Sequence, residues 1–294
     1  MAVKKSLPLG RSSFKALRED NCLYIDKTEM LFQVMNNKRY NFFARPRRFG
    51  KSLLLSTLKE IFLGRKELFT DLWIGQHSGY AWPVHPVIYI DMNMIDKNSP
   101  EALEASLRRM MDRIAFEYGV ENYFAESSGE KLAGLVRGLF PRGKVVILID
   151  EYDQPITSRF PDMELAAANR EVLREFYSRI KSLDEYIEFL FITGVSKFTK
   201  TSLFSGLNNL KDISFDKNVS TILGCTKEEI DLYLSEYVEE FAQVKSMTSQ
   251  QVYDEMREWY NGYRFSNGPG TVYNPWSIFN YLDSQRRSNY WFAS

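Results

Sequence analysis

Apolar runs of strand length recur along the first 223 residues, separated by longer segments of helical period. A run that is apolar at consecutive positions is typical of a strand buried on both faces, as in a parallel sheet covered by helices. Such runs span residues 40–44, 87–91, 144–151 and 188–197, and a fifth strand is expected near 212–215 or 220–223. The pattern predicts an α/β fold of three layers, with a parallel sheet between two layers of helices.

Helices are predicted between these runs from their periodicity and their capping residues. The expected spans are residues 53–63, 99–118, 129–140 and 163–183. Ser99 is a favourable N-cap, and Pro100 suits the first helical position because an N–H there would have no helical partner. Gly64 and Gly119 follow two of the expected helices, where glycine commonly ends a helix.

The character of the chain changes after residue 223, where helical segments and aromatic residues predominate. Capping boxes at 226–229 and 248–251 open helices that are expected to end near residues 241 and 260. Residues 263–273 have the pattern of a hairpin around a glycine-rich turn, and Asn274-Pro275 opens a last helix. We predict a small, mainly helical, winged-helix-like lid. Its aromatic residues could stack on bases or form a partner surface, but such residues more commonly form the core of a small subdomain.

Residues 45–52, Arg-Pro-Arg-Arg-Phe-Gly-Lys-Ser, lie between the first strand and the first helix. This order is that of a phosphate-binding loop, in which backbone N–H groups at a helix N-terminus bind phosphate oxygens. Lys51 is expected to be an exposed ligand of the outer phosphates, and the Ser52 hydroxyl a ligand of Mg²⁺. Arg45 replaces the first glycine of the usual pattern. The residues expected to contact the nucleotide are Arg45, Pro46, Arg47, Arg48, Phe49, Gly50, Lys51, Ser52 and Leu53.

A second motif favours this interpretation over a basic surface loop that merely contains Gly-Lys-Ser. The strand at 144–151 ends in Asp150 and Glu151, and ligands bind at the carboxyl ends of strands in open α/β sheets. Asp150 is expected to hold Mg²⁺ through a water molecule, and Glu151 to orient and deprotonate the attacking water. Together the two motifs predict that the chain binds ATP or GTP.

The apolar run at 188–197 also ends in polar residues. In P-loop ATPases the strand after the acidic one carries a polar residue beside the γ-phosphate, and Thr193 and Ser196 are the candidates here. Lys197 is a candidate for neutralising charge in the transition state. For each of these residues alone, an ordinary polar turn after a strand is an equally good interpretation.

Composition adds few constraints. Among the 294 residues, 38 basic side chains balance 38 acidic ones, so net charge does not favour nucleic acid or an anionic membrane. Cys22 and Cys225 are expected to be buried free thiols, which is consistent with the cytoplasm. The two histidines exclude a histidine-rich metal site. We find no cleavable signal and no apolar stretch of membrane-spanning length, so we expect a cytoplasmic protein without a membrane partner.

Motifs along almost the whole chain resemble those of the bacterial AAA-ATPase-like family, in which a P-loop domain usually precedes a nuclease-like domain of the PD-(D/E)XK superfamily. The matching segments are residues 7–10, 14–17, 24–28, 45–52, 149–155, 193–197, 260–263 and 273–277. The segment with Arg45 resembles the family's own form of the loop. The chain stops at Ser294, where family members usually continue, and it contains no Asp…Glu-x-Lys constellation, so we assign no nuclease activity to it.

We divide the chain into an N-terminal segment that packs on the core (1–35), a P-loop ATPase core (36–223) and the helical lid with its hairpin (224–294). ATP is favoured over GTP because no Asn-Lys-x-Asp motif that reads guanine ends a strand. In related families the segment corresponding to residues 24–28 tends to lie near the base.

The loop is surrounded by more basic residues than phosphate binding requires. Arg47 and Arg48 suit contact with the γ-phosphate, action as arginine fingers on a neighbouring subunit, or binding of nucleic-acid phosphates. Pairing with acids such as Asp153 and Asp26, which would only shape the loop, is the further alternative. DNA or RNA and a second copy of the chain are therefore the expected partners besides ATP. The basic residues concerned are Lys38, Arg39, Arg45, Arg47 and Arg48.

Two functions remain open from the sequence. The first is a Mg-dependent ATPase that couples nucleotide binding or hydrolysis to a nucleic-acid-related or effector task. The second is a nucleotide-binding regulatory switch with slow hydrolysis that acts on a nuclease-like effector domain. The expected catalytic residues are Glu151, Lys51, Thr193, Ser196 and Arg48, and the expected metal ligands are Ser52 and Asp150.

Overall fold

The computed structural model describes residues 4–290, except 38, 122, 124, 198–202, 205, 206, 208 and 269. Its centre is a parallel sheet with the strand order β2-β3-β4-β1-β5. The strands are β1 (Tyr40–Ala44), β2 (Val87–Asp91), β3 (Val145–Asp150), β4 (Ile187–Gly194) and β5 (Lys211–Asp212). The predicted α/β fold with a parallel sheet is confirmed. The fifth strand is short because Asp212 accepts hydrogen bonds from the backbone and hydroxyl of Ser214, which turns the chain out of the sheet.

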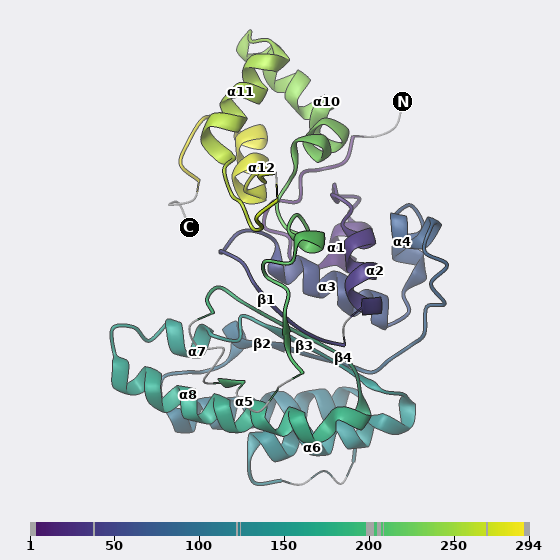
Figure 1. Ribbon diagram of the computed structural model, residues 1–294, viewed down its shortest axis with the longest axis vertical. Helices are drawn as coiled ribbons and strands as arrows, with labels where there is room; N and C mark the ends of the chain where they lie inside the picture. Colours follow the sequence, from purple (N-terminus) through teal and green to yellow (C-terminus); the bar gives the residue numbers. More distant parts are fainter. Residues whose placement is uncertain are drawn as a thin grey trace.

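Helices cover both faces of this sheet, as expected (Figure 1). One layer contains α1 (Phe14–Glu19), α2 (Thr28–Asn37), α3 (Lys51–Phe62) and α4 (Trp73–Gln76). The other contains α5 (Pro100–Glu117), α6 (Ser128–Leu139), α7 (Gln154–Thr157) and α8 (Met163–Ser178). Short 3-10 helices span Lys66–Phe69, Met92–Met94, Phe140–Arg142, Arg179–Tyr186 and Lys217–Val219. The helix predicted to reach residue 183 thus ends at Ser178 and continues as a 3-10 helix.

The two faces of β3 explain its unbroken apolar sequence. Val145, Ile147 and Ile149 belong to the core under α5, α6 and α8, whereas Val146 and Leu148 belong to the core under α3. All six residues of the strand are buried. Because neighbouring side chains on a strand point to opposite faces, a strand between two helical layers requires an apolar residue at nearly every position.

The C-terminal residues form a separate helical unit beside the sheet domain (Figure 1). It consists of α10 (Lys227–Lys245), α11 (Ser249–Tyr260) and α12 (Pro275–Ser284) around their own apolar core. Both predicted capping boxes are present, although α10 extends beyond the expected residue 241. The predicted hairpin consists of an antiparallel bridge between Tyr263 and Val272, and Tyr273 pairs with Cys225. Its winged-helix character and the three-part division of the chain remain predictions.

Two further expectations can be compared with the structure. Cys22 and Cys225 are buried and form no disulfide, and burial raises the pKa of the Cys225 thiol to about 12. None of the helices in the described part of the chain combines the length and apolar character needed to cross a membrane.

The close packing beneath the end of β4 generates a prediction about stability. A Cβ atom added at Gly194 would lie 2.3 Å from the ring of Tyr152 and 2.8 Å from the Asp153 carboxylate. We expect Gly194→Ala to lower the free energy of unfolding by about 3 kcal/mol, since overpacking a core forces its neighbours to move. Gly268→Ala is the matched control, because a Cβ atom there would meet one side-chain hydroxyl, that of Ser266, at 3.3 Å instead of a packed ring. Urea denaturation that gives the two variants equal stability would contradict this packing.

Candidate nucleotide-binding site

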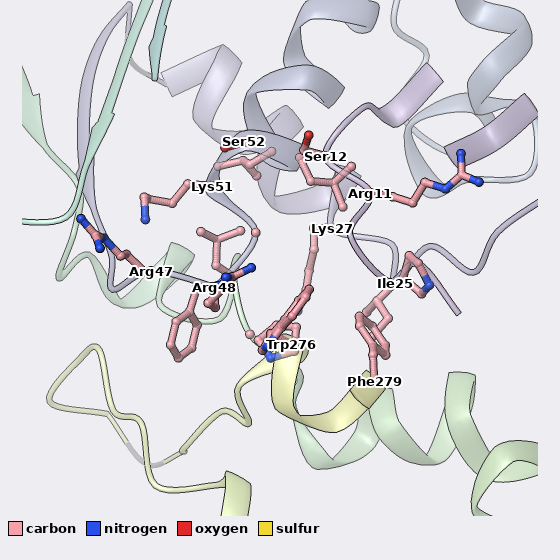
Figure 2. A pocket seen from close by; sticks show the side chains of 18 of the residues that line it. Arg11, Ser12, Ile25, Lys27, Arg47, Arg48, Lys51, Ser52, Trp276 and Phe279 are labelled. Atoms are coloured by element: carbon pink, nitrogen blue, oxygen red, sulfur yellow. The ribbon is translucent and has the colours of Figure 1, made fainter. Parts of the chain in front are cut away.

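A cavity of about 540 Å³ opens at the N-terminus of α3, between the sheet domain and the C-terminal unit (Figure 2). The loop and first turn of α3 line it with residues 47–54, and the N-terminal segment contributes residues from 8–12 and 23–27. The strand ends contribute Asn93, Glu151 and Gln154, and the C-terminal unit contributes residues 224–225, Pro275, Trp276 and Phe279. The cavity therefore brings together all three predicted regions of the chain.

The backbone of the loop is shaped to present N–H groups to this cavity. Gly50 is the N-cap of α3 with a φ of 94°, and no side chain caps the helix. An added Cβ there would have no neighbour closer than 3.8 Å, so the left-handed conformation, rather than lack of space, favours glycine. The first N–H groups of α3 thus remain available to an anion, where the helix dipole also favours negative charge.

Lys51 lies inside the loop and is only 4% exposed, contrary to the expectation of an exposed ligand. Its Nζ donates hydrogen bonds to the carbonyl oxygens of Arg45 (3.1 Å) and Pro46 (3.0 Å). Burial lowers the pKa of the Lys51 ammonium, whereas the negative charges of Glu151 and Asp150 oppose that shift. The ammonium is therefore fixed by the loop itself and placed near the two acids at the end of β3.

The two acids are linked by Thr193 at the end of β4, the strand that lies between β1 and β3. The Thr193 hydroxyl donates to Asp150 Oδ1 (2.6 Å) and accepts the backbone N–H of Glu151 (3.4 Å). Asp150 and Thr193 are fully buried, whereas Glu151 lines the cavity and has a φ of 51°. The Thr193 hydroxyl therefore bridges Asp150 and the backbone of Glu151. Thr193 itself does not line the cavity, whereas Glu151 does.

Ser196 and Lys197 point to other partners. The buried carboxylate of Asp153 accepts hydrogen bonds from the backbone and hydroxyl of Ser196, both at 2.9 Å. Lys197 Nζ lies 3.0 Å from Asp212 and 3.9 Å from the centroid of the Phe215 ring. Neither residue lines the cavity, so the structure does not bring them together with Lys51.

Arg45 is buried beside the cavity instead of lining it, and only 1% of it is exposed. Its guanidinium lies between the rings of Phe43 (4.3 Å) and Phe265 (4.1 Å) and donates to the carbonyl oxygens of Ala44 and Ser214. Burial lowers the pKa of this guanidinium to about 9. The residue that replaces the usual glycine thus attaches the loop to the hairpin of the C-terminal unit.

Two other loop residues contact the same unit. Phe49 is buried, and its ring meets those of Tyr263 and Phe265 edge-on at 4.8 and 5.3 Å. The Arg48 guanidinium lies over the ring of Trp276, 4.3 Å from its centroid (Figure 2). The sequence did not decide the role of the C-terminal aromatic residues. Tyr260 and Tyr273 belong to the core of their unit, whereas Tyr263, Phe265 and Trp276 pack on the phosphate loop.

The acids proposed as partners of the loop arginines are occupied elsewhere. Asp26 accepts hydrogen bonds from the backbone of Thr28 (2.8 Å) and Trp73 (2.7 Å). Within the described part of the chain, neither Arg47 nor Arg48 forms an ion pair. Arg39 lies at the amino end of β1, paired with Asp184, and is remote from the loop; Lys38 lies outside the described residues.

Sequence reasoning missed Asn93 and Gln154 as cavity residues. Both follow the carboxyl ends of strands, and this position is the signal that could have identified them. It also missed the structural role of Lys27, which lines the cavity, donates to the Thr221 carbonyl (2.8 Å) and pairs with Glu229 of α10.

Comparisons with known proteins show the family to which this chain belongs. A family model described as a predicted AAA-ATPase matches residues 8–204. An uncharacterized protein in the vnfD 5′ region of Azotobacter chroococcum mcd 1 is 35% identical over 99% of this chain and 54% of its own length. The chain thus spans about half the length of that curated relative. The Walker-type ATPase of Pyrococcus abyssi is a solved structure with a TM-score of 0.47 and 15% identity, over 97% of this chain and 72% of that chain. Given the loop, the acid-tipped strand and the extent of the family match, this chain belongs to the AAA-ATPase-like family of predicted AAA-ATPases.

Proposed function

We propose that this chain binds ATP together with Mg²⁺ in the cavity and hydrolyses it. The observation that carries the proposal is the convergence of Lys51, the free N-terminus of α3 and Glu151 on one cavity. These groups are the parts that phosphoryl transfer to water requires: donors for the phosphates and a carboxylate for the attacking water.

The buried position of Lys51 suits the binding of phosphates. An ammonium taken out of water interacts more strongly with a nearby anion, because the surrounding medium screens the charges less. Burial already lowers the pKa of Lys51, and bound phosphates would raise it again by favouring the charged form. Phosphate binding and protonation of Lys51 are therefore expected to reinforce each other.

Ser52 and Asp150 supply the hydroxyl and carboxylate oxygens that Mg²⁺ prefers. In the described part of the chain, no three His, Cys, Asp or Glu side chains form a cluster that could hold a metal alone. A magnesium ion bound with a nucleotide takes most of its ligands from phosphates and water, so one hydroxyl and one carboxylate of the protein would suffice. Asp150 is buried and held by Thr193, so it is a suitable fixed acceptor for a metal-bound water.

Glu151 is proposed to orient the attacking water and accept its proton. Its left-handed backbone, with a φ of 51°, turns the chain at the strand end, and the Thr193 hydroxyl accepts its N–H. Strained backbone of this kind is concentrated at functional sites, where the surroundings maintain it. The nucleotide base is proposed to lie near Ile25 and Phe279, two cavity residues that Figure 2 shows next to each other and away from Lys51.

The alternative function, a regulatory switch with slow hydrolysis, has one observation in its favour. Arg45, Arg48 and Phe49 of the loop all contact aromatic residues of the C-terminal unit. Nucleotide bound at the loop would therefore affect how this unit is held. Nucleic acid and a second copy of the chain remain proposed partners; the contact of Arg48 with Trp276 favours a site completed within one chain.

Replacing Lys51 tests nucleotide binding. We expect Lys51→Met, which keeps an unbranched stem in the buried site, to weaken MgATP binding by about 100-fold, since a charged donor to phosphate is lost. Lys197→Met is the matched control, because Lys197 pairs with Asp212 outside the cavity. Unchanged ATP affinity of a folded Lys51→Met protein in calorimetry would remove the basis for the phosphate loop.

Replacing Glu151 separates binding from hydrolysis. Glu151→Gln is expected to retain MgATP affinity and to lose hydrolysis by about 100-fold or more, because an amide orients water but does not take its proton. The exposed Glu171 of α8 provides the control substitution Glu171→Gln. If phosphate release by Glu151→Gln proceeds at the wild-type rate, another residue is the base.

Replacing Thr193 tests its role between the acids. Thr193→Val removes the hydroxyl that donates to Asp150 and leaves a similar volume. We expect the Mg²⁺ concentration for half-maximal hydrolysis to rise by about tenfold, since a buried carboxylate loses a hydrogen bond worth about 1–2 kcal/mol. Thr193→Ser is expected to behave like the wild type, and equal Mg²⁺ dependence of both variants would argue against a positioning role.

A further inference from the structure

Arg48 connects the cavity to the C-terminal unit. Its guanidinium lies over the Trp276 ring at 4.3 Å, and both residues line the cavity that also contains Lys51 and Ser52. In the view of Figure 2, Arg48 lies next to Trp276 of α12, and Lys51 lies on the opposite side of Arg48. The two contacting residues are separated by more than 200 positions in the sequence, so the contact depends on how the C-terminal unit is seated.

The backbone of Arg48 is unusual for a residue with a side chain. Its φ is 67°, a left-handed conformation that costs a non-glycine residue about 1 kcal/mol or more. The next residue, Phe49, is held by the rings of Tyr263 and Phe265. The C-terminal unit thus packs against both residues and helps to maintain this part of the loop.

The start of the helix that carries Trp276 is anchored by hydrogen bonds. Trp276 lies in the first turn of α12, whose N-cap Asn274 accepts the backbone N–H of Ser277 at 2.9 Å. The Asn274 N–H donates to the Tyr260 carbonyl at 3.0 Å, and Asn274 is 1% exposed. Pro275 occupies the first helical position, where its fixed φ suits the helix. The indole ring is therefore presented to Arg48 by a capped and anchored helix start.

The geometry of this contact leaves the arginine able to bind a second group. The indole ring attracts the charge of the guanidinium above it through the π-system. Because the indole offers an N–H donor and no acceptor, the five N–H donors of Arg48 are left for another acceptor. Arginine can bind phosphate in a bidentate manner, which lysine cannot do.

The other two loop arginines are placed differently. Arg45 is buried and donates to backbone carbonyls, so its donors are directed away from the cavity. Arg47 and Arg48 are both exposed and both line the cavity, and the charge of Arg47 acts on Lys51. Within the described residues, Arg48 differs from Arg47 in that its guanidinium contacts an aromatic ring of the C-terminal unit.

We propose that Arg48 binds the nucleotide phosphates within its own chain and that Trp276 is the positioning residue that holds its guanidinium at the cavity. This inference rests on the proposed function and makes the C-terminal unit part of the nucleotide site. By thermodynamic reciprocity, nucleotide that binds Arg48 in this position also strengthens the seating of α12 against the loop.

A double-mutant cycle tests the proposal, with MgATP affinity of the purified chain measured by calorimetry. Arg48→Ala and Trp276→Leu are each expected to weaken binding by about tenfold. In the Arg48→Ala background, Trp276→Leu is expected to have no further effect, because Trp276 acts through Arg48. In an Arg47→Ala background, Trp276→Leu should still weaken binding by about tenfold.

Two further variants distinguish positioning from packing. Trp276→Tyr keeps a ring and is expected to bind MgATP within about threefold of the wild type. Trp259→Leu is the matched control: Trp259 lies in α11 of the same unit, and the Arg287 guanidinium lies over its ring at 4.7 Å, outside the cavity. Should Trp276→Leu not fold, Trp276→Met replaces it in the cycle.

Each remaining outcome overturns a defined part of the account. Additive losses for Arg48→Ala and Trp276→Leu would show that Trp276 acts independently of Arg48 and would reject this inference. Binding and hydrolysis of MgATP by the wild type would still uphold the proposed function. Recovery of hydrolysis on mixing Arg48→Ala with Lys51→Met protein would place the arginine in a neighbouring subunit and reject action within one chain. A wild-type chain that binds no MgATP would reject the proposed function and this inference together.

Discussion

The buried ammonium of Lys51 is the constraint on which the arrangement of the site depends. A charge taken out of water is tolerated only when hydrogen bonds and opposite charges replace its hydration. The loop carbonyls of Arg45 and Pro46 supply the hydrogen bonds, and Glu151 and Asp150 supply the negative charge. The sheet order makes this feasible, because β4 separates β1 from β3 and places Thr193 where its hydroxyl fixes Asp150. The buried charge of Lys51 thus depends on the strand order and on the hydrogen bond between Thr193 and Asp150, because these place the acids that balance it.

The same loop is supported from its other side by aromatic residues. Arg45, Arg48 and Phe49 meet Phe265, Trp276 and Tyr263 of the C-terminal segment. Arginine and aromatic side chains pair well in such places, since the rings attract the charge while excluding water. The loop therefore has two sets of partners. These are the acids at the end of β3, which are proposed to act in hydrolysis, and the aromatic residues, which connect the loop to a separately packed unit. Binding of a ligand in the cavity would therefore affect both the acids at the end of β3 and the aromatic residues of the C-terminal unit.

Much of the fold follows from local pattern, whereas much of the site does not. The unbroken apolar sequence of β3 and the capping boxes of α10 and α11 predicted those elements because strand burial and helix capping are local effects. The motifs also predicted that Lys51, Ser52 and Glu151 lie together, and all three line one cavity; their roles towards a nucleotide remain predictions. The burial of Arg45 and the contact of Arg48 with Trp276 could not be predicted, because contacts between distant segments leave no periodic signal. The polar residues at the end of β4 were predicted to belong to the site from their position alone. In the structure, Ser196 donates a hydrogen bond to Asp153, and Lys197 pairs with Asp212.

We propose that the phosphates of ATP bind at the N-terminus of α3 and that Ser52 and Asp150 would hold the magnesium ion. A crystal structure of the Glu151→Gln chain with MgATP tests it most directly, because that variant is expected to retain uncleaved nucleotide. The account predicts phosphate oxygens within hydrogen-bond distance of the backbone N–H groups of residues 50–52, Lys51 Nζ and the Arg48 guanidinium, with the base near Ile25 and Phe279. Nucleotide bound elsewhere, or phosphates out of reach of Lys51, would contradict it.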